Sequence, residues 1–293
     1  MPRVTVAVCT YDRVPLLNKC LQSLAQQTVD RASFDVLVVD NHGSAACRET
    51  AIAYGAAYVH EPAAGLSHAR NRAAREATTD WLLYLDDDAV AHPDMMECLR
   101  LHLRNAAVRV IGGRYEHLFG QAPPDWIRHY YKRPVCAAPG EGLLVLNNDQ
   151  YLAGCVFAAE RRLFLDFPFR PDLGMQADRP GYGEESEWQD RVRRAGVPVH
   201  FDRAVAIDHL VRPDELTIRA RIDKAYAHGR YRARTRVRGK VEKAEFFGRA
   251  LRLLAKTIPY DVGRVLFRPN FSWRNGVVST LGKLAYLRGE YGK

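Results

Sequence analysis

Residues 81–94 read WLLYLDDDAVAHPD, so that a buried apolar run ends in three consecutive aspartates. Adjacent carboxylates repel one another and aspartate is depleted in strands, so folding alone gives little reason for this arrangement. Side chains alternate along an extended chain, which would place Asp86 and Asp88 on one side and Asp87 on the other. Two carboxylates on one side form a site for a hard divalent cation that completes its shell with substrate phosphates. The competing explanation, in which Asp94 caps the following helix, accounts for none of the three.

Apolar runs before and after these aspartates alternate with segments of helical periodicity. We expect strands at residues 4–9, 34–40, 56–60, 81–85 and 108–113, and helices at residues 14–27, 44–54, 67–76 and 93–105. This alternation is typical of an α/β protein whose mostly parallel sheet is flanked by helices on both faces. Ligands bind beyond the carboxyl ends of such strands, so the polar segments after the first four strands should meet in one crevice. The first turn lacks the G-x-G-x-x-G pattern of dinucleotide-binding enzymes.

The alternation breaks down after residue 113. RYEHLFGQAPPDWIRHYYKRP (114–134) predicts an irregular surface loop able to fold over a ligand, and a strand-like segment follows at 151–159. GEESEWQDRVRRAG (183–196) predicts a helix with three glutamates in its first turn, more than compensation of the helix dipole requires. Trp188 on this helix could form the floor of an acceptor site or be buried in the core.

Length and composition allow one large α/β domain with an appendage, since the chain has 293 residues and 47% of them are hydrophobic. We find no run of 18 apolar residues and no signal-peptide pattern, so we expect the protein in the cytoplasm. The six cysteines form no C-x-x-C pair, and we expect them to be reduced.

Charge is distributed unevenly along the chain. The first 218 residues carry 24 Lys or Arg and 29 Asp or Glu, a net charge of −5, whereas residues 219–293 carry 19 and 5, a net charge of +14. An acidic body with a basic C-terminal segment indicates a second function that involves an anionic surface such as lipid or nucleic acid.

The ordered set CTYDR, VVDN, GLSHARN, LYLDDD and GEESEWQDRVRRAG resembles the family 2 glycosyltransferases with the GT-A fold. Each motif is weak alone, but five of them in this order and at these intervals are specific. The resemblance covers roughly residues 3–215. It implies a GT-A catalytic domain at residues 1–215, with a mostly parallel nucleotide-binding sheet, followed by a basic, largely helical region at residues 216–293.

The resemblance also implies which residues contact the nucleotide sugar. These are Thr10, Tyr11, Asp12, Asp40, Asn41, Arg70, Asn71, Asp86 and Asp87. Tyr11 could stack on uracil, and Asp40 could accept a hydrogen bond from a ring N–H, which favours uracil or thymine. Asp40 and Asn41 could also simply start a turn, and both interpretations can hold together. Arg70 would make bidentate bonds to the diphosphate, the alternative being a solvated Arg on a helix surface.

A metal site and a catalytic base follow from the same resemblance. Asp88 would bind Mn²⁺ or Mg²⁺, which holds the diphosphate and neutralises charge on the departing nucleoside diphosphate. His209 could complete the metal shell or be structural. Glu185 lies where an inverting enzyme has the base that takes the proton of the attacking hydroxyl. The family's usual Asp is a Glu at this position, so Glu184 or Glu187 could face the acceptor instead.

The function expected from these motifs is metal-dependent, inverting transfer of a sugar, most simply from a UDP-linked donor, to a hydroxyl of a glycan or lipid-linked acceptor. Many bacterial relatives have Asn where this chain has Cys155, so the identity of the sugar cannot be copied from them. A nucleotidyltransferase is the alternative enzyme, but it needs a glycine-rich loop that CTYDR lacks. A non-catalytic nucleotide-sugar-binding protein would be expected to have a damaged base or metal motif.

The C-terminal region predicts a basic amphipathic helix. Its apolar positions are Phe246, Phe247, Ala250, Leu251 and Leu254, with Arg249, Arg252 and Lys256 between them. Such a helix could lie on an anionic membrane at its cytoplasmic face, or it could pack its apolar stripe onto the catalytic domain. We expect no nucleic-acid partner because no recognition motif accompanies the basic residues.

Overall fold

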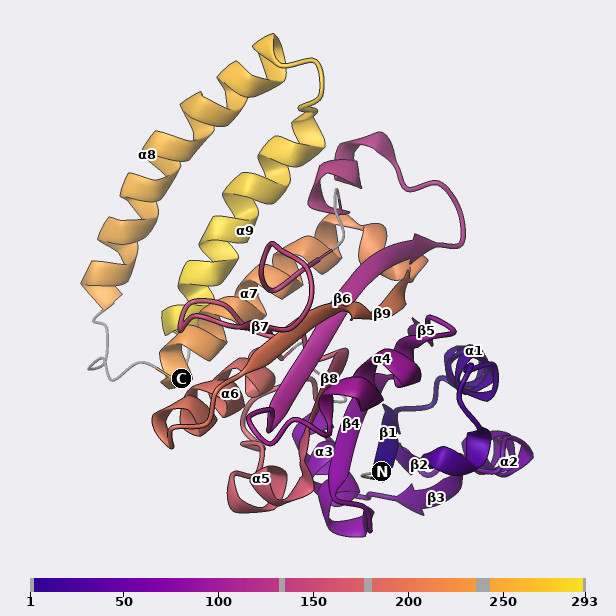
Figure 1. Cartoon of the computed structure of the whole chain (residues 1–293). Coiled ribbons are helices and arrows are strands. Elements are labelled where there is room, and N and C mark those ends of the chain that lie inside the picture. Colours follow the sequence, from indigo (N-terminus) through magenta and orange to yellow (C-terminus); the bar gives the residue numbers. More distant parts are fainter. Residues whose placement is uncertain (1–2, 132–134, 177–180, 236–242, 292–293) are drawn as a thin grey trace. The chain divides into compact units, whose positions relative to one another are not determined.

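A computed structural model of the chain describes residues 3–131, 135–176, 181–235 and 243–291 (Figure 1). The strands are β1 (Val4–Thr10), β2 (Asp35–Asp40), β3 (Ala57–His60), β4 (Trp81–Asp86), β5 (Ala89–Ala91), β6 (Val110–Phe119), β7 (Leu144–Val145), β8 (Val156–Glu160) and β9 (His200–Val211). The α-helices are α1 (Val14–Ala25), α2 (Ala45–Ala53), α3 (Leu66–Glu76), α4 (Met95–His102), α5 (Arg161–Asp166), α6 (Glu184–Arg194), α7 (Ile218–Thr235), α8 (Lys243–Phe267) and α9 (Trp273–Tyr291). Short 3₁₀ helices are η1 (Arg31–Ser33), η2 (Asp125–Tyr131) and η3 (Pro213–Leu216).

The chain divides into two compact units. The first comprises Met1–Leu118, Arg133–Ala177 and Glu184–Leu210, and the second comprises Phe119–Lys132, Asp178–Gly183 and Val211–Lys293. The expected linear division at residue 215 therefore differs from the observed one, because two internal segments group with the C-terminal helices. Every site residue expected from the sequence lies in the first unit.

The first unit contains one mixed sheet with strand order β3-β2-β1-β4-β8-β6-β9-β5, and β7 pairs with β9. β1 to β4 are parallel, which confirms the expected α/β fold. β8 lies between β4 and β6 and is antiparallel to both. The sequence did not reveal this insertion, because a strand buried on both faces reads as an uninterrupted apolar run whatever the direction of its neighbours.

Helices cover both faces of this sheet, and the strand residues alternate between them (Figure 1). On β1, Val6 and Val8 pack into a core with α1, α2 and α4, while Ala7 and Cys9 pack into a second core with α3, α5 and α6. All six cysteines are free, as expected, and most of them are buried. The tips of the parallel strands are thereby fixed from both sides.

Trp188 belongs to the core. It is fully buried on α6, and its ring stacks on Phe164 with centroids 4.7 Å apart and on Phe169 with centroids 5.9 Å apart. The possibility that this side chain forms the floor of an acceptor site is therefore wrong. Its packing instead holds α6, and the glutamates of its first turn, against the sheet.

The segment expected to be an irregular loop after residue 113 begins as a strand. β6 continues to Phe119, and a 3₁₀ helix follows at Asp125–Tyr131. In residues 114–119 (RYEHLF) the ring side chains Tyr115, His117 and Phe119 alternate with Arg, Glu and Leu, a period of two that is typical of a half-exposed strand. The aromatic content of the segment concealed this alternation from the sequence analysis.

The second unit is largely helical, as expected. α7 packs closely on α9, and α9 on α8. The α7–α9 approach depends on Gly229, where a Cβ atom would overlap the carbonyl oxygen of Tyr286. None of the helices among the described residues combines the length and the apolar character that crossing a bilayer requires.

Gly113 on β6 offers a test of the sheet. A Cβ atom there would overlap the backbone carbonyl oxygen of Val205 on β9, so Gly113→Ala should lower the free energy of unfolding by about 3 kcal/mol. Gly120, just after β6, is the matched control, because a Cβ atom at this position would meet no other atom within 4 Å. Gly120→Ala should change stability by less than about 0.5 kcal/mol. Urea denaturation measures both. Equal midpoints for the two variants would show that β6 and β9 are not this close.

Candidate active site

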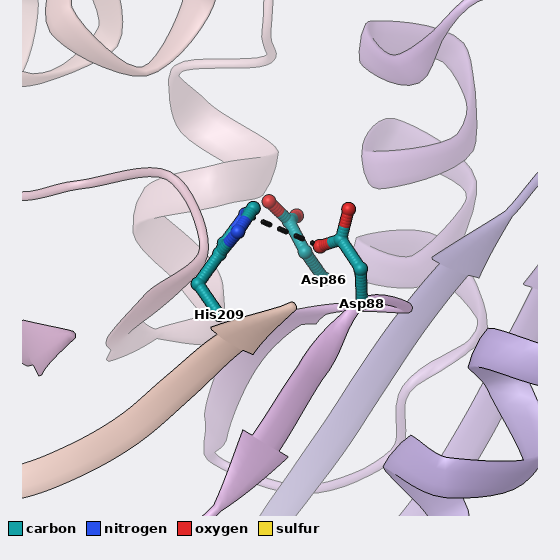
Figure 2. A group of neighbouring side chains, drawn as sticks. All are labelled: Asp86, Asp88 and His209. Atoms are coloured by element: carbon teal, nitrogen blue, oxygen red, sulfur yellow. Dashed lines mark ion pairs between the residues drawn. The ribbon is translucent and has the colours of Figure 1, made fainter. Parts of the chain in front are cut away.

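Asp86, Asp88 and His209 form one cluster at the carboxyl end of β4. Each contributes a ligand atom, and these atoms all lie within 4.8 Å of one another. Figure 2 shows the three side chains pointing toward a common point from the end of β4, the turn after it and β9. The shortest contact joins Asp88 Oδ1 and His209 Nε2 at 3.2 Å. The sequence expectation that Asp86 and Asp88 face the same way is confirmed, although a turn, and not a continuous strand, brings them together.

Backbone pairing explains how His209 reaches the two aspartates from a distant part of the sequence. β5 runs antiparallel to β9 with Ala89 opposite His209. The ladder continues where the Leu210 N–H donates to the Asp88 carbonyl oxygen at 2.7 Å. The relative positions of the carboxylate and the imidazole are thus set by a sheet and not by a flexible loop.

The donor set of this cluster fits a divalent metal ion. Two carboxylates and one imidazole suit a divalent transition ion such as Mn²⁺ and also accommodate Mg²⁺. Asp88 is only 6% exposed, and the buried Nδ1 atom of His209 has no hydrogen-bond partner among the described residues. Three protein ligands leave coordination positions open for the phosphates of a substrate.

Asp87 faces away from this cluster and is anchored to the tip of β1. Its carboxylate accepts hydrogen bonds from Thr10 Oγ1 at 2.8 Å and from Arg13 Nη1 at 3.3 Å. Burial raises the pKa of Asp87 above its ordinary value, and Arg13 and Thr10 offset part of that effect. In this structure Thr10 and Asp87 therefore bind each other, and their expected contacts with a nucleotide sugar stay predictions.

Arg70 on α3 connects the metal-binding cluster to α6. Its guanidinium is 2% exposed and contacts Glu184 Oε1 at 2.8 Å, the Gly154 carbonyl oxygen at 2.9 Å and Asp86 Oδ1 at 3.3 Å. It also lies over the rings of Tyr84 and two phenylalanines. Arg70 is an internal cross-link in this structure, so a bidentate contact with a diphosphate would have to replace existing partners.

The three glutamates at the start of α6 have different surroundings. Glu184 is buried against Arg70, and Glu187 pairs with Arg191 at 2.9 Å. Glu185 has no ion pair among the residues that the structure describes. It lies beside Gly154, where a Cβ atom would be 3.4 Å from the Glu185 carboxyl carbon.

The electrostatic surroundings of Glu185 suit a base. Burial and the neighbouring carboxylate of Glu184 raise the pKa of Glu185 well above its ordinary value, and Arg70 offsets only part of this. A raised pKa makes a carboxylate a stronger base near neutral pH. Of the three glutamates left open by the sequence, Glu185 thus combines a raised pKa with the lack of an ion pair among the described residues.

Asp40 and Asn41 organise the loops around the tip of β2. Asp40 is fully buried and accepts from the backbone N–H groups of His42 and Ser44 and from the Tyr58 hydroxyl. Asn41 bonds to the backbone of the loop before α3, at Glu61, Ala63 and Gly65. The turn interpretation is confirmed for both residues, and their contact with a base stays a prediction.

Tyr11 and Asp12 form the exposed surface at this end of the sheet. Tyr11 is 40% exposed and makes an edge contact with His42, with ring centroids 5.1 Å apart. Asp12 has a φ of 51°, a left-handed conformation that is uncommon for residues other than glycine and is often found at functional sites. His42 extends this surface, and the sequence analysis missed it although it lies within the polar segment after β2.

Asn71 does not reach this surface. Its side-chain amide forms two hydrogen bonds of 2.8 Å with the backbone of Phe169, one as donor and one as acceptor. This pairing fixes α3 to the segment before α6. A role in phosphate binding stays a prediction for Asn71, since both ends of its amide are engaged.

Three further residues border the cluster and were missed in the sequence. Tyr115 and His117 on β6 lie beside His209, with ring centroids 5.6 and 6.4 Å away. Arg13 lies 3.9 Å from Asp88 in addition to its contact with Asp87. The position of Arg13 directly after the TYD segment is a usable signal in the sequence, whereas the part of β6 that carries Tyr115 and His117 predicts a loop.

Comparisons with known proteins agree with this geometry. The family described as "Glycosyl transferase family 2" matches residues 5–166, from β1 to the end of α5. Succinoglycan biosynthesis protein ExoM of Rhizobium meliloti (strain 1021) is 32% identical over 132 residues, which are 43% of this chain and 42% of ExoM. The chain therefore covers less than half the length of this relative.

Two solved structures resemble the fold. Mannosyltransferase PcManGT from Pyrobaculum calidifontis, in complex with GDP-Man and Mn²⁺, has a TM-score of 0.65 at 18% identity over 98% of this chain and 87% of that one. Glucosyl-3-phosphoglycerate synthase from Mycobacterium tuberculosis, in complex with Mn²⁺, UDP and glucosyl-3-phosphoglycerate, has a TM-score of 0.50 at 19% identity over 76% and 78%. The expected GT-A fold is thus confirmed. Because the family match extends over more than half of the sequence and includes the three aspartates, the chain belongs to glycosyl transferase family 2.

Proposed function

We propose that the chain is a metal-dependent inverting glycosyltransferase. It moves a sugar from a UDP-linked donor to a hydroxyl of a glycan or lipid-linked acceptor. The observation that carries the proposal is the Asp86, Asp88 and His209 cluster, which is linked through Arg70 to the start of α6, where Glu185 lies. Such a pairing of a metal-binding group with a base of raised pKa suits the displacement of a diphosphate by a hydroxyl.

Each part of the site has one task in this reaction. Glu185 takes the proton of the acceptor hydroxyl as its oxygen forms a bond to the anomeric carbon of the donor. The bond between that carbon and the diphosphate oxygen breaks, and its electron pair leaves with the nucleoside diphosphate. Asp88, Asp86 and His209 would hold a divalent ion, which when bound neutralises the charge on the leaving group. Attack from the side opposite the leaving group inverts the anomeric centre.

The nucleotide base is assigned to the exposed surface at the tips of β1 and β2. Tyr11 has an accessible ring on which a base can stack. Asp40 supports the surrounding turn from within, and we assign Asp12 beside it to contact with the nucleotide. The similar structures contain guanosine or uridine nucleotides, and the choice of uridine here rests on the sequence motifs CTYDR and VVDN.

A lipid-linked acceptor would bring the enzyme to a membrane surface, and α8 supports this part of the proposal. Phe246 packs on Tyr291 within the second unit, with centroids 5.0 Å apart, whereas Phe247 and Leu251 are exposed. Further along α8, Ile258, Val262 and Leu266 are exposed as well. These positions share one face at helical spacing, which together with the basic charge of the region is typical of binding to an anionic bilayer.

Asp88→Asn should abolish transfer, by at least about 100-fold, because the metal cluster loses a charged ligand. Mn²⁺ binding measured by calorimetry should weaken in parallel. The matched control is Asp208→Asn: Asp208 precedes His209 on β9, points to the other face and contacts His92 at 3.3 Å. It should leave Mn²⁺ binding and transfer unchanged. Retention of wild-type Mn²⁺ affinity by Asp88→Asn would refute the metal site.

Glu185→Gln should lower the rate of transfer at least about 100-fold while leaving donor and Mn²⁺ binding intact, because it removes the base and keeps the shape of the side chain. Glu187→Gln is the control, because Glu187 lies in the same first turn of α6 but is paired with Arg191. Its rate of transfer should stay within a few-fold of that of the wild type. Steady-state kinetics with a competent donor and acceptor measure both. A fully active Glu185→Gln variant would remove this residue from the role of base.

The raised pKa of Glu185 predicts how both the rate of transfer and the stability of the wild type depend on pH. The Glu185→Gln variant tests the effect on stability. Transfer by the wild type should rise with pH, with a midpoint above the ordinary range of a glutamate, because the base must be deprotonated. The folded protein also holds this proton more tightly than the unfolded chain, so the wild type loses stability as pH rises through the raised pKa. Glu185→Gln lacks this loss, and its melting temperature should gain on that of the wild type with increasing pH.

Leu251→Gln should reduce flotation with vesicles that contain phosphatidylglycerol by about 10-fold, because a leucine on the apolar stripe of α8 no longer enters the bilayer surface. Leu101 on α4 is the matched control, since both leucines are 70% exposed. Leu101→Gln should float as the wild type does. Binding should also weaken with added salt, and a wild type that does not float at low salt would contradict membrane association.

A further inference from the structure

The helices of the second unit line an open cavity of about 840 Å³. It lies between α7, α8 and α9, which run beside one another in the orange to yellow part of Figure 1. This volume is within the range of sites that bind small molecules. Neither the family match, which ends at residue 166, nor the proposed sugar transfer assigns it a role.

Positive charge dominates the lining of this cavity. Its cationic side chains are Arg221, Lys224, Arg249, Arg252, Arg264 and Lys283. Among the described residues that line it, the one carboxylate is Glu290, which already pairs with Arg249 at 3.0 Å and with Arg232 at 3.2 Å. A cavity with this surplus of cations is suited to an anionic ligand.

Two of the guanidinium groups are held in place with donors unused. Arg221 lies over the rings of Tyr130 and Tyr131, at 4.6 and 4.5 Å, and its buried Nε and Nη2 atoms have no hydrogen-bond partner among the described residues. Arg264 lies 3.7 Å over the ring of Phe271, and its buried Nε atom also lacks such a partner. Buried donors without acceptors are costly, and aromatic stacking leaves the planar fork preorganised for a phosphate.

Part of the remaining lining is apolar. Leu253 of α8, Phe271 before α9, and Val278 and Leu287 of α9 form this wall. An inorganic phosphate would satisfy the arginines but would leave most of the volume and this wall unused. A ligand that carries both a phosphate and an apolar chain matches both parts of the lining.

We propose that this cavity binds the phosphate head group of an anionic lipid together with the first part of its apolar chain. The head group accepts hydrogen bonds from Arg221 and Arg264, and the chain lies along Leu253, Val278 and Leu287. The outward face of α8 carries exposed apolar side chains, which suits a site supplied from a membrane surface. The inference concerns the second unit by itself and does not depend on the metal cluster or on Glu185.

Dodecyl phosphate, below its critical micelle concentration, is the probe, and calorimetry on the full chain is the measurement. It should bind at least about 10-fold more tightly than inorganic phosphate, which lacks the chain, and than dodecyl maltoside, which lacks the charge. Arg221→Met, which keeps the packing on the two tyrosines, should weaken binding about 10-fold. Arg252→Gln, at a more exposed lining position, should weaken it as well.

Arg288→Gln on α9 is the matched control, because it removes the same charge at an exposed position outside the cavity, and its affinity should stay within about twofold of wild type. Equal binding of inorganic phosphate and dodecyl phosphate would reduce the site to one for free phosphate and overturn the proposal. Equal binding of dodecyl maltoside, or wild-type affinity in both Arg221→Met and Arg252→Gln, would overturn it too. The Asp88→Asn variant should bind dodecyl phosphate normally, so that failure of the sugar-transfer proposal can be told apart from failure of this one.

Discussion

The repulsion among Asp86, Asp87 and Asp88 is offset by different main partners for each, although Arg13 also lies 3.9 Å from Asp88, and the arrangement of the site follows from this division. Asp86 contacts Arg70, Asp87 contacts Arg13 and Thr10, and Asp88 contacts His209. Two like charges about 4 Å apart repel by about 4 kcal/mol at an effective dielectric constant of about 20, so three adjacent carboxylates need compensation close by. The turn after β4 turns Asp87 toward β1 and leaves the other two facing β9. A divalent ion would add the charge that the protein partners supply only in part.

Arg70 connects the aspartates after β4 to the glutamates at the start of α6. A guanidinium that is 2% exposed cannot be buried with one carboxylate at 3.3 Å alone, and Glu184 at 2.8 Å supplies the second. This ion pair joins α3 to the first turn of α6, and the stacked Trp188 further along α6 packs the helix against the core. Glu185 follows Glu184 in the sequence. It therefore lies near the same guanidinium, while the ion pair with Arg70 is formed by Glu184. The candidate metal cluster and the proposed base are therefore linked through one buried arginine.

How far the sequence could predict this structure depends on the range of the interactions involved. Local periodicity predicts where β1 to β4 lie along the chain and where each of them ends. The alternation of side chains predicts that Asp86 and Asp88 face the same way. The antiparallel β8 could not be foreseen, because VFAA is apolar on both faces and carries no signal of its neighbour's direction. The contact of Arg70 with Glu184 could not be predicted, because the two residues are 114 positions apart, and the phosphate role of Arg70 stays a prediction. Tyr115 and His117 were missed because an aromatic, proline-containing segment disguised a strand with a period of two.

The two proposed sites bind phosphate in opposite ways, and the charge asymmetry of the sequence parallels this difference. The site proposed in the first unit consists of carboxylates and an imidazole, which attract a phosphate only through a divalent ion. In the site proposed for the second unit, guanidinium groups that stack on tyrosines and on Phe271 can donate hydrogen bonds to a phosphate directly. A site that holds a diphosphate through a metal ion binds this product only indirectly. Such binding suits a leaving group, which has to depart after the reaction. A cluster of preorganised arginines beside an apolar wall suits a ligand that stays bound, as the proposed anionic lipid would.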